Sequence, residues 1–236
     1  MLQRALNWSG RTAAGAYAGS LLQMDVRWHQ PLPTGAKIVA ANHPTTTDAF
    51  ILMGLIPERM SILIKEACFK IPALGLFLRG AGHVPVLNGN GRLALLHGQR
   101  LLGGGRTVGI FPEGVLSPLT GGVGPLRTGV ARLALSTGAP VVPVGIALRR
   151  ENIRFVSGQI DGLPEVVRWY LHGPYCVTVG VPMRFVGDAE DREQVHTVLA
   201  RIAQRIAQLS QESARRVRPA QTPTGSVALS PGAVGA

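Results

Sequence analysis

A histidine and an aspartate stand five positions apart in the segment AANHPTTTDAF, residues 40–50, directly after a short apolar run. A carboxylate that accepts a hydrogen bond from one imidazole nitrogen fixes the tautomer and makes the other nitrogen a better base. His43 and Asp48 are therefore candidates for a general base and its orienting carboxylate. The alternative is a capped turn with a histidine at the surface, because this spacing alone often arises by chance.

A glutamate on a turn bracketed by prolines is the second candidate group, in the segment GIFPEGVLSP, residues 109–118. Glu113 and Gly114 follow the apolar run TVGIF, residues 107–111, which predicts a buried strand. In open α/β sheets, ligands bind beyond the carboxyl ends of the strands, where the His43 segment is also expected. Glu113 is therefore either part of the same site or an ordinary surface residue of the turn.

A basic residue at the start of a predicted helix is the third candidate. Arg127 begins the segment RTGVARLALSTG, residues 127–138, whose periodic apolar residues predict a helix. The free N–H groups at a helix N-terminus favour anions. Arg127 is therefore a candidate for binding an anionic group of a ligand.

The elements that would position these residues alternate between strands and helices. Apolar runs predict strands at residues 37–41, 61–65, 83–87, 107–111, 140–148 and 175–185. Apolar periodicity and helix-ending glycines predict helices at residues 47–56, 72–80, 91–105, 127–138 and about 191–217. This alternation predicts an α/β fold with a mixed, largely parallel sheet flanked by helices.

The 236 residues are enough for one domain, which we expect over residues 1–218. Residues 219–236 are rich in Pro, Gly and Ser and are expected to be disordered. Residues 1–24 carry apolar residues at helical spacing, which fits either a core-packed helix or a helix lying in the membrane interface. Their longest uncharged stretch, Thr12 to Met24, is shorter than the roughly 20 residues that span a bilayer.

The formal net charge of +11 favours anionic partners, such as phosphate-bearing ligands or an anionic membrane surface. Aromatic residues make up 5% of the chain and no basic helix is interleaved with them, so nucleic acid is not expected as a partner. Cys68 and Cys176 form no CxxC motif, which fits a reducing, cytoplasmic setting. The histidines never pair at zinc-ligand spacing and no phosphate-binding loop motif is present, so neither a metal nor a cofactor is expected.

Four segments, in order, resemble the sequence blocks of the glycerolipid acyltransferases, the 1-acylglycerol-3-phosphate acyltransferase family. They are NHPTTTD (an N-H-x-x-x-x-D motif), KEACFKIPALGLFLRGAGHVPV, FPEGVLS and PLRTGVARLALSTGAPVVPVGI, within residues 37–148. The resemblance implies transfer of a fatty acyl group from an acyl-CoA or acyl-carrier-protein thioester to a hydroxyl of a lipid acceptor. His43 would be the base and Asp48 would orient it, while Asn42, Glu113 and Gly114 would bind substrate. The expected location is peripheral, on the cytoplasmic face of the cell membrane.

Two departures from the family bear on the acceptor. Asn88 stands where the second block usually ends in arginine, and Val115-Leu116 replaces a Thr-Arg pair of the third block. Those arginines are thought to hold the acceptor's phosphate, and Arg92 or Arg127 would have to substitute. The alternatives are the same chemistry on an acceptor without a phosphomonoester, such as an amino-lipid, sugar lipid or secondary metabolite, and a non-catalytic lipid- or acyl-CoA-binding protein. No feature of the sequence specifies the oligomeric state.

Overall fold

A seven-stranded sheet forms the centre of the computed structural model, which describes residues 2–87, 90–160 and 163–217. Its strands are β1 (Leu22–Trp28), β2 (Lys37–Ala41), β3 (Met60–Lys65), β4 (Val84–Val86), β5 (Thr107–Ile110), β6 (Val141–Leu148) and β9 (Gly173–Val179). Their order is β1-β9-β6-β2-β5-β3-β4, and of the neighbouring pairs only β6 and β9 run antiparallel. The predicted mixed, largely parallel sheet is confirmed.

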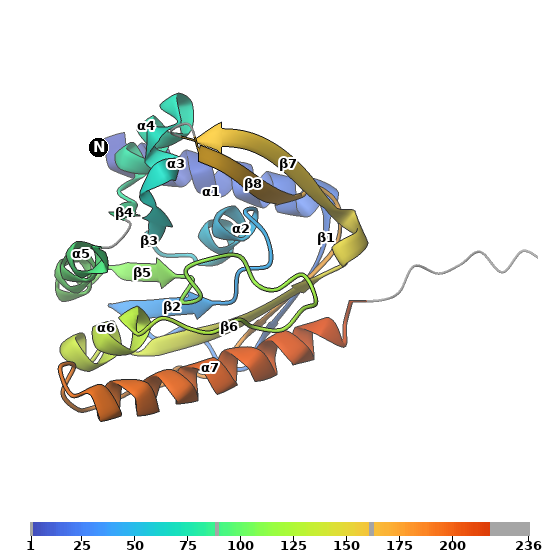
Figure 1. The fold of residues 1–236 in the computed structure, drawn as a ribbon. Helices are drawn as coiled ribbons and strands as arrows, with labels where there is room; N and C mark the ends of the chain where they lie inside the picture. Colours follow the sequence, from blue (N-terminus) through green and yellow to red (C-terminus); the bar gives the residue numbers. More distant parts are fainter. Residues whose placement is uncertain (1, 88–89, 161–162, 218–236) are drawn as a thin grey trace, which may run out of the picture.

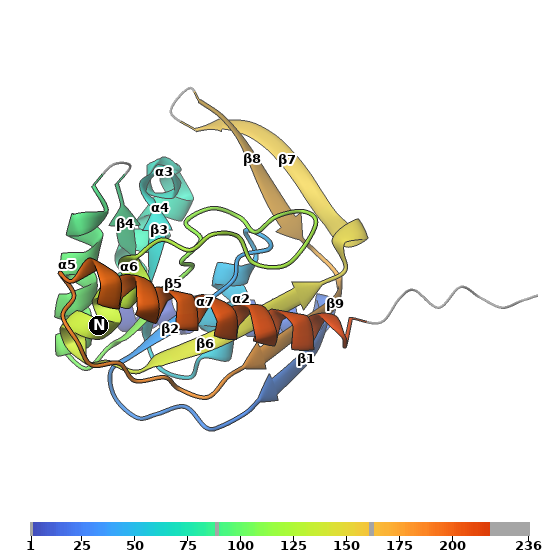
Figure 2. The same ribbon diagram turned by 60° about the horizontal axis from the view of Figure 1, so that its bottom comes forward.

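Helices cover both faces of this sheet (Figures 1 and 2). On one face lie α1 (Leu2–Leu21), α2 (Asp48–Leu55) and α4 (Pro72–Ala81), and α3 (Glu66–Lys70) connects β3 to α4. On the other lie α5 (Gly91–Gly103), α6 (Gly129–Thr137) and α7 (Arg192–Ala214). Within the described part of the chain, no helix combines the length and the apolar character needed to cross a membrane.

The central strand β2 is apolar along its length because both of its faces are buried. Ile38 packs into the core on the α7 side, whereas its neighbour Val39 packs into the core on the α2 side. Every residue of β2 is buried, as is every residue of β5. The short runs KIVAA and TVGI are therefore fixed in place, and the loops that follow them start from rigid positions.

Several elements differ from the prediction. The N-terminal helix ends at Leu21 rather than near residue 24, and the chain continues without a break into β1. A hairpin that the sequence did not predict, β7 (Ile153–Ile160) and β8 (Leu163–Tyr170), follows a 3₁₀ turn at Arg150–Asn152. The strand predicted at 175–185 ends at Val179, after which Met183 forms only an isolated bridge with Val141. The predicted disordered tail, 219–236, lies outside the described residues.

The first two of these differences share a cause. Leu22–Trp28 has no Gly or Pro separating it from the preceding helix, so apolar periodicity alone could not locate the change of element. The hairpin strands mix polar and apolar residues, so no regular alternation marks them in the sequence. They are stabilised by pairing with each other. Tertiary pairing therefore decides both segments.

The carboxyl ends of β2, β5 and β6 meet at one edge of the sheet because these strands run parallel. The loops after them, residues 42–47, 111–128 and 149–152, therefore lie at the same edge. The β7–β8 hairpin rises from this edge and arches over it, as Figure 2 shows. Ligand sites of open α/β sheets are found at this end of the strands.

Gly145 provides a test of how α7 packs on the sheet. The hydroxyl of Ser213 on α7 donates to the Gly145 carbonyl at 2.9 Å, and a Cβ at Gly145 would overlap the backbone of Leu209 and Ser210. We expect Gly145→Ala to lower the free energy of unfolding by about 3 kcal/mol or more, because rigid backbone cannot yield as a side chain can. Urea unfolding of the wild type and the variant measures this difference in the free energy of unfolding.

The matched control is Gly158→Ala on β7, where nothing lies within 4 Å of an added Cβ. That substitution is expected to change the free energy of unfolding by less than about 1 kcal/mol. Equal effects of the two substitutions would contradict the close approach of α7 to β6.

Candidate active site

The structure brings His43 and Asp48 together. His43 Nδ1 lies 3.1 Å from Asp48 Oδ2, and the Asp48 side chain is fully buried, whereas that of His43 is 19% exposed. The imidazole stacks on the Phe111 ring, with centroids 3.9 Å apart. Nε2 of His43 has no hydrogen-bond partner among the described residues. An Nδ1–H that donates to a carboxylate leaves Nε2 free to accept a proton, which is the arrangement of a general base.

Further donors hold the Asp48 carboxylate. Oδ2 also accepts from the Thr45 backbone N–H at 2.8 Å, while Oδ1 accepts from the Thr45 hydroxyl at 2.7 Å and from the Tyr175 hydroxyl at 2.8 Å. Burial, and after it the charge of Asp48, raises the pKa of Tyr175 well above its usual range. Tyr175 therefore stays protonated and serves as a permanent donor. Asp48 is also the first residue of α2, where the helix dipole stabilises a negative charge.

Sequence reasoning missed Tyr175. It lies on β9, 127 positions beyond Asp48, and no local spacing relates the two residues. The signal that could have found Tyr175 is a buried tyrosine in an apolar strand, because a buried hydroxyl needs a partner. Its contribution is to orient the carboxylate that orients His43.

The Glu113 carboxylate ties the turn after β5 to the His43 backbone. Oε1 accepts from the His43 N–H at 3.0 Å and from the Ser117 hydroxyl at 2.6 Å, and Oε2 accepts from the Gly124 N–H at 2.6 Å. The Ser117 N–H in turn donates to the His43 carbonyl at 2.7 Å. The prediction that Glu113 lies beside the His43 loop is thus met in the structure. Its side chain is buried with these internal donors, and the expected contact with substrate stays a prediction.

Gly114 and Arg127 lie against each other. The Gly114 N–H donates to the Phe111 carbonyl at 3.0 Å and closes the turn at a φ of 69°, a conformation that favours glycine. A Cβ on Gly114 would come within 2.6 Å of Arg127 Nε. Arg127 precedes α6 by two residues instead of opening it, because its N–H donates to the Pro112 carbonyl at 2.7 Å. The Arg127 guanidinium is at the surface beside this turn.

Arg92 lies in the first turn of α5 and is exposed. Its guanidinium forms no hydrogen bond or ion pair within the part of the chain that the structure describes. The structure therefore does not tie Arg92 to the His43 loop. Of the two family departures, Leu116 is half-buried and its neighbour Val115 is exposed, while Asn88 lies outside the described residues.

Asn42 links β2 to β6. Its amide NH₂ donates to the Ile146 carbonyl at 2.9 Å, and its amide oxygen accepts from the Ile146 N–H at 2.7 Å. The side chain thus continues the β2–β6 ladder past Ala41 and fixes where the His43 loop begins. The predicted substrate contact of Asn42 remains a prediction, and the residue does line the cavity described next.

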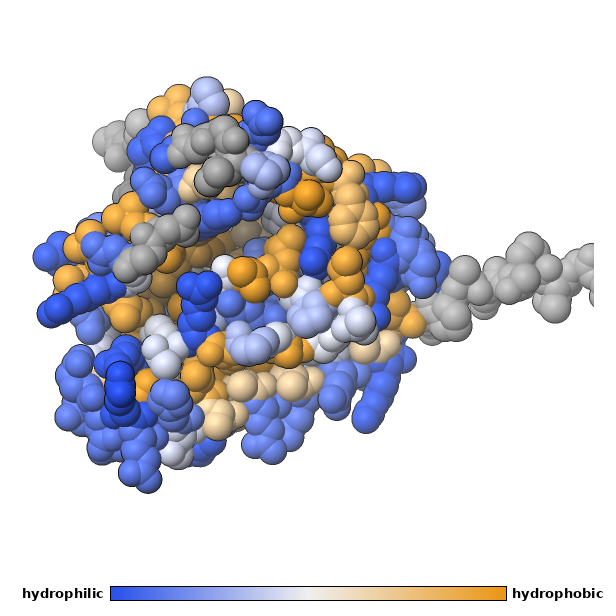
Figure 3. All heavy atoms as spheres, in the orientation of Figure 1, coloured by the Kyte–Doolittle hydropathy of each residue, from blue (hydrophilic) through white to orange (hydrophobic). Residues whose placement is uncertain are grey.

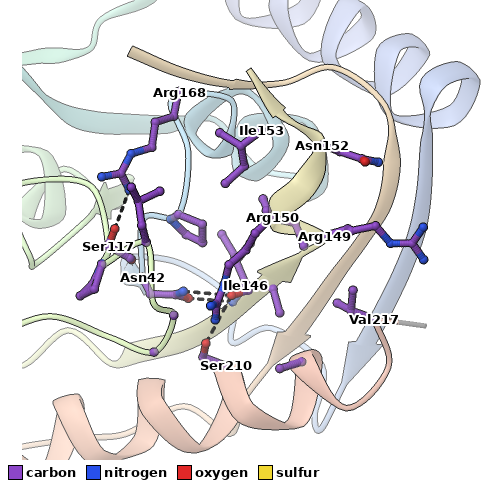
Figure 4. A pocket seen from close by; sticks show the side chains of 18 of the residues that line it. Asn42, Ser117, Ile146, Arg149, Arg150, Asn152, Ile153, Arg168, Ser210 and Val217 are labelled. Atoms are coloured by element: carbon purple, nitrogen blue, oxygen red, sulfur yellow. Dashed lines mark hydrogen bonds between the residues drawn. The ribbon is translucent and has the colours of Figure 1, made fainter. Parts of the chain in front are cut away.

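A cavity of about 680 Å³ opens beside the His43 loop. Asn42 and Pro44, the neighbours of His43, form part of its wall together with Ser117. The opposite walls come from the end of β6, the hairpin and the last turns of α7, as Figure 4 shows. Three arginines that sequence reasoning did not select line it: Arg149, Arg150 and Arg168. Arg149 and Arg150 could have been found from their place directly after the strand PVVPVGIAL.

Apolar side chains gather across the middle of the face shown in Figure 3, with hydrophilic ones around them. Phe111, which stacks on His43, belongs to the buried core on the α2 side, so the imidazole of His43 lies against apolar surroundings. Such surroundings suit a substrate with a hydrocarbon chain. Among the described residues, no group of three or more His, Cys, Asp or Glu side chains could hold a metal ion.

A second histidine near the sheet has a different character. His83 is buried, and its Nδ1 accepts the Ile62 N–H at 3.1 Å. Burial, and after it the positive charge of Arg106, lowers the pKa of His83 to about 4. His83 is therefore neutral at physiological pH, and its Nδ1 is occupied by a backbone N–H.

The chain is similar in sequence to proteins named as acyltransferases. A family model described as "Acyltransferase" matches residues 23–147. The chain is 30% identical over 125 residues to "1-acyl-sn-glycerol-3-phosphate acyltransferase BAT2, chloroplastic" of Brassica napus, covering 51% of this chain and 36% of that one. It is 28% identical over 137 residues to "1-acyl-sn-glycerol-3-phosphate acyltransferase" of Cocos nucifera, covering 56% of this chain and 44% of that one. The matched segments thus span less than half the length of these relatives.

The fold has a counterpart among solved structures. The crystal structure of the 1-acyl-sn-glycerophosphate acyltransferase PlsC from Thermotoga maritima superposes with a TM-score of 0.57 at 23% identity. The superposition covers 86% of this chain and 78% of that one. At this identity the likeness concerns the fold.

Proposed function

Because the chain belongs to the acyltransferase family, we propose that it transfers a fatty acyl group from an acyl-CoA or acyl-carrier-protein thioester to a lipid hydroxyl. The proposed acceptor is a lysophospholipid-type molecule, 1-acylglycerol-3-phosphate or a relative. The observation that carries this proposal is the His43–Asp48 pair, with Nδ1 held at 3.1 Å and Nε2 left without a partner in the described structure.

The proposed reaction uses one proton transfer in each direction. His43 Nε2 takes the proton of the acceptor hydroxyl while the hydroxyl oxygen attacks the thioester carbonyl carbon. As the tetrahedral intermediate collapses, the C–O bond remains and the C–S bond breaks. The leaving thiolate then takes the proton from the imidazolium. The Asp48 carboxylate accepts the hydrogen bond of the imidazolium and stabilises it, and the proposal invokes no acyl-enzyme, metal or cofactor.

The test is an acyl-transfer assay with purified protein. Radiolabelled acyl-CoA is incubated with a panel of acceptors that includes 1-acylglycerol-3-phosphate, an uncharged monoacylglycerol and an amino-lipid, and acyl-carrier-protein thioesters form a second donor series. Labelled ester that depends on both enzyme and acceptor supports the proposal. Binding of acyl-CoA without transfer to any acceptor would instead favour a non-catalytic acyl-CoA-binding protein.

The second candidate function keeps the chemistry and changes the acceptor. Val115 is exposed and Leu116 half-buried on the turn next to Glu113, where an arginine would offer two parallel hydrogen bonds to phosphate. An apolar pair at this turn favours a less charged or bulkier acceptor. A higher kcat/KM for the uncharged acceptor than for 1-acylglycerol-3-phosphate would establish this alternative.

We also propose a peripheral position on the cytoplasmic face of the membrane. The segment Ile71–Leu78 divides between two environments, because Leu78 is buried whereas Leu76 is 71% exposed and Ile71 is partly exposed. Half of α4 thus packs on the core while the other half offers apolar surface. Together with the net charge of +11, this surface suits an anionic bilayer.

We expect the protein to bind anionic vesicles more strongly than neutral ones and to lose that preference as salt rises. Leu76→Glu should weaken binding about tenfold, because it removes an apolar side chain and adds a repulsive charge. The control is Val186→Glu, at a fully exposed site between β9 and α7. Vesicle co-sedimentation measures the binding of the wild type and of both variants. Equal binding of the wild type to anionic and neutral vesicles would refute the electrostatic part of the proposal. Wild-type binding by Leu76→Glu would refute the role of α4.

A further inference from the structure

The cavity beside the His43 loop has a wall that the proposed mechanism does not use. Its floor is largely apolar, formed by Ile146, Leu148 and Ile153 with Leu119 and Val217. Its charged lining consists of the arginines 149, 150 and 168 and one glutamate, Glu151, so positive charge is in excess. His43 does not itself line the cavity, although the residues on either side of it do. The cavity thus adjoins the candidate base and carries unused positive charge.

Arg150 reaches across this cavity from the end of β6. Its guanidinium approaches the turn at Gly121 so closely that a Cβ there would overlap it, and Gly121 has a φ of 95° that itself favours glycine. Figure 4 shows the side chain running from the start of the hairpin toward Asn42 and Ser210, whereas Arg149 extends the opposite way. The Arg150 guanidinium has no hydrogen-bond or ion-pair partner within the described residues. Its donors are therefore available to a ligand.

Arg168 enters the same cavity from β8. Nη1 donates to the Ser117 carbonyl at 2.6 Å, which fixes the guanidinium and leaves its other N–H groups without a partner among the described residues. Ser117 is hydrogen-bonded to the His43 backbone, so a single residue, Ser117, connects Arg168 to the His43 loop. The Arg168 carbonyl also accepts the Thr46 N–H at 2.8 Å, which anchors this end of the hairpin to the His43–Asp48 loop. Arg168 is thus held in place before any ligand arrives.

We propose that Arg150 and Arg168 form a phosphate-binding site for a substrate in this cavity, in place of the arginine that is absent at position 116. The inference rests on the proposed function and names the group that this part of the site would recognise. Guanidinium groups offer paired N–H donors that match phosphate oxygens, and an apolar floor strengthens the interaction by excluding water. The volume of about 680 Å³ falls within the range of small-molecule sites.

A phosphate at this place could belong to either substrate. An acceptor such as 1-acylglycerol-3-phosphate carries a phosphomonoester a few bonds from its hydroxyl, whereas CoA carries a 3′-phosphate and a pyrophosphate far from its thioester. The chemistry that the two arginines recognise is the same in both cases. Separate binding measurements on each substrate distinguish the sources.

The test compares Arg150→Gln and Arg168→Gln with wild type and with Arg154→Gln, a control at an exposed arginine of the same hairpin that does not line the cavity. Calorimetry measures binding of CoA, of 3′-dephospho-CoA and of a short-chain 1-acylglycerol-3-phosphate, so no turnover is required. Arg150→Lys and Arg168→Lys, which keep the charge, are rescue variants. Circular dichroism and urea unfolding establish that each variant is folded.

We expect each Gln variant to bind one of the phosphate-bearing probes roughly ten- to a hundredfold more weakly, the loss typical of a charge-assisted hydrogen-bonding group. Weaker binding of 1-acylglycerol-3-phosphate alone assigns the site to the acceptor, and weaker binding of CoA assigns it to the donor. For CoA, an effect that vanishes with 3′-dephospho-CoA assigns the 3′-phosphate, and one that persists assigns the pyrophosphate. Wild-type affinity for both probes in folded Arg150→Gln and Arg168→Gln, or an equal loss in Arg154→Gln, overturns the proposal. Failure of acyl transfer with every acceptor would overturn the proposed function and leave these binding results to stand by themselves.

Discussion

Alanine in place of His43 is expected to lower kcat for acyl transfer by about 10²–10⁴-fold, the usual contribution of a positioned base. The ring nitrogen Nε2 is the one left free, since Nδ1 is engaged by Asp48 at 3.1 Å. The loop should keep its shape without the imidazole, because Glu113 and Ser117 bind the His43 backbone N–H instead of the ring. Initial rates at saturating donor and acceptor measure kcat, and urea unfolding measures the free energy of unfolding.

The matched control is His196→Ala, at an exposed histidine of α7, which should leave kcat and stability unchanged. Asp48→Asn should also be severe. The Asp48 oxygens accept from Thr45, Tyr175 and His43, and an amide NH₂ in either orientation would face one of these donors. A folded His43→Ala protein with undiminished kcat would show that another group takes the acceptor's proton.

Local features of the sequence were enough to predict that His43, Asp48 and Glu113 lie at one edge of the sheet. Each follows an apolar run, and parallel strands bring the residues after them to the same edge. The strands KIVAA and TVGIF were predictable because both faces of a central parallel strand are buried, which gives an unbroken apolar run. The order of the loops then follows from the order of the strands.

The partners that hold these residues in place were not predictable, because long-range pairing supplies them. Tyr175 reaches Asp48 from β9, and the Asn42 amide bonds the backbone of Ile146, more than a hundred positions away. Such contacts depend on strand order and register, and the antiparallel placement of β9 beside β6 has no sequence signal. A buried polar side chain indicates that a hydrogen-bond partner exists, but the sequence does not identify that partner.

The choice of basic residues also depended on the fold. Arg127 was selected for its position at a predicted helix start, and Arg92 as a substitute for the arginines of the family blocks. The cavity is instead lined by Arg149, Arg150 and Arg168. The last of these lies on a hairpin that the sequence did not predict, since its strands mix polar and apolar residues. Its tie to the His43 loop is a backbone bond from Thr46 to the Arg168 carbonyl. Hydrogen bonds between backbone groups cannot be inferred from the types of the residues that form them.

Glutamine in place of Glu113 is expected to lower both the free energy of unfolding and kcat. Glu113 is 3% exposed, and its carboxylate accepts from the His43 N–H and the Ser117 hydroxyl on one oxygen and from the Gly124 N–H on the other. Either orientation of a glutamine amide sets its NH₂ against a backbone N–H. A buried donor without an acceptor costs about 1–3 kcal/mol, which we expect as the loss of stability.

The effect of Glu113→Gln on turnover follows from the same contact. Glu113 holds the backbone of the residue whose ring is the proposed base, and a displacement of about 1 Å can cost on the order of 10²-fold in rate. We therefore expect kcat to fall on that scale with little change in KM, as measured by steady-state kinetics beside urea unfolding. The control is Glu193→Gln at an exposed glutamate of α7, with a change in stability within about 0.5 kcal/mol. A raised KM with normal kcat and stability would instead mean that Glu113 contacts the acceptor, as the family resemblance predicts, and that other contacts hold the His43 loop.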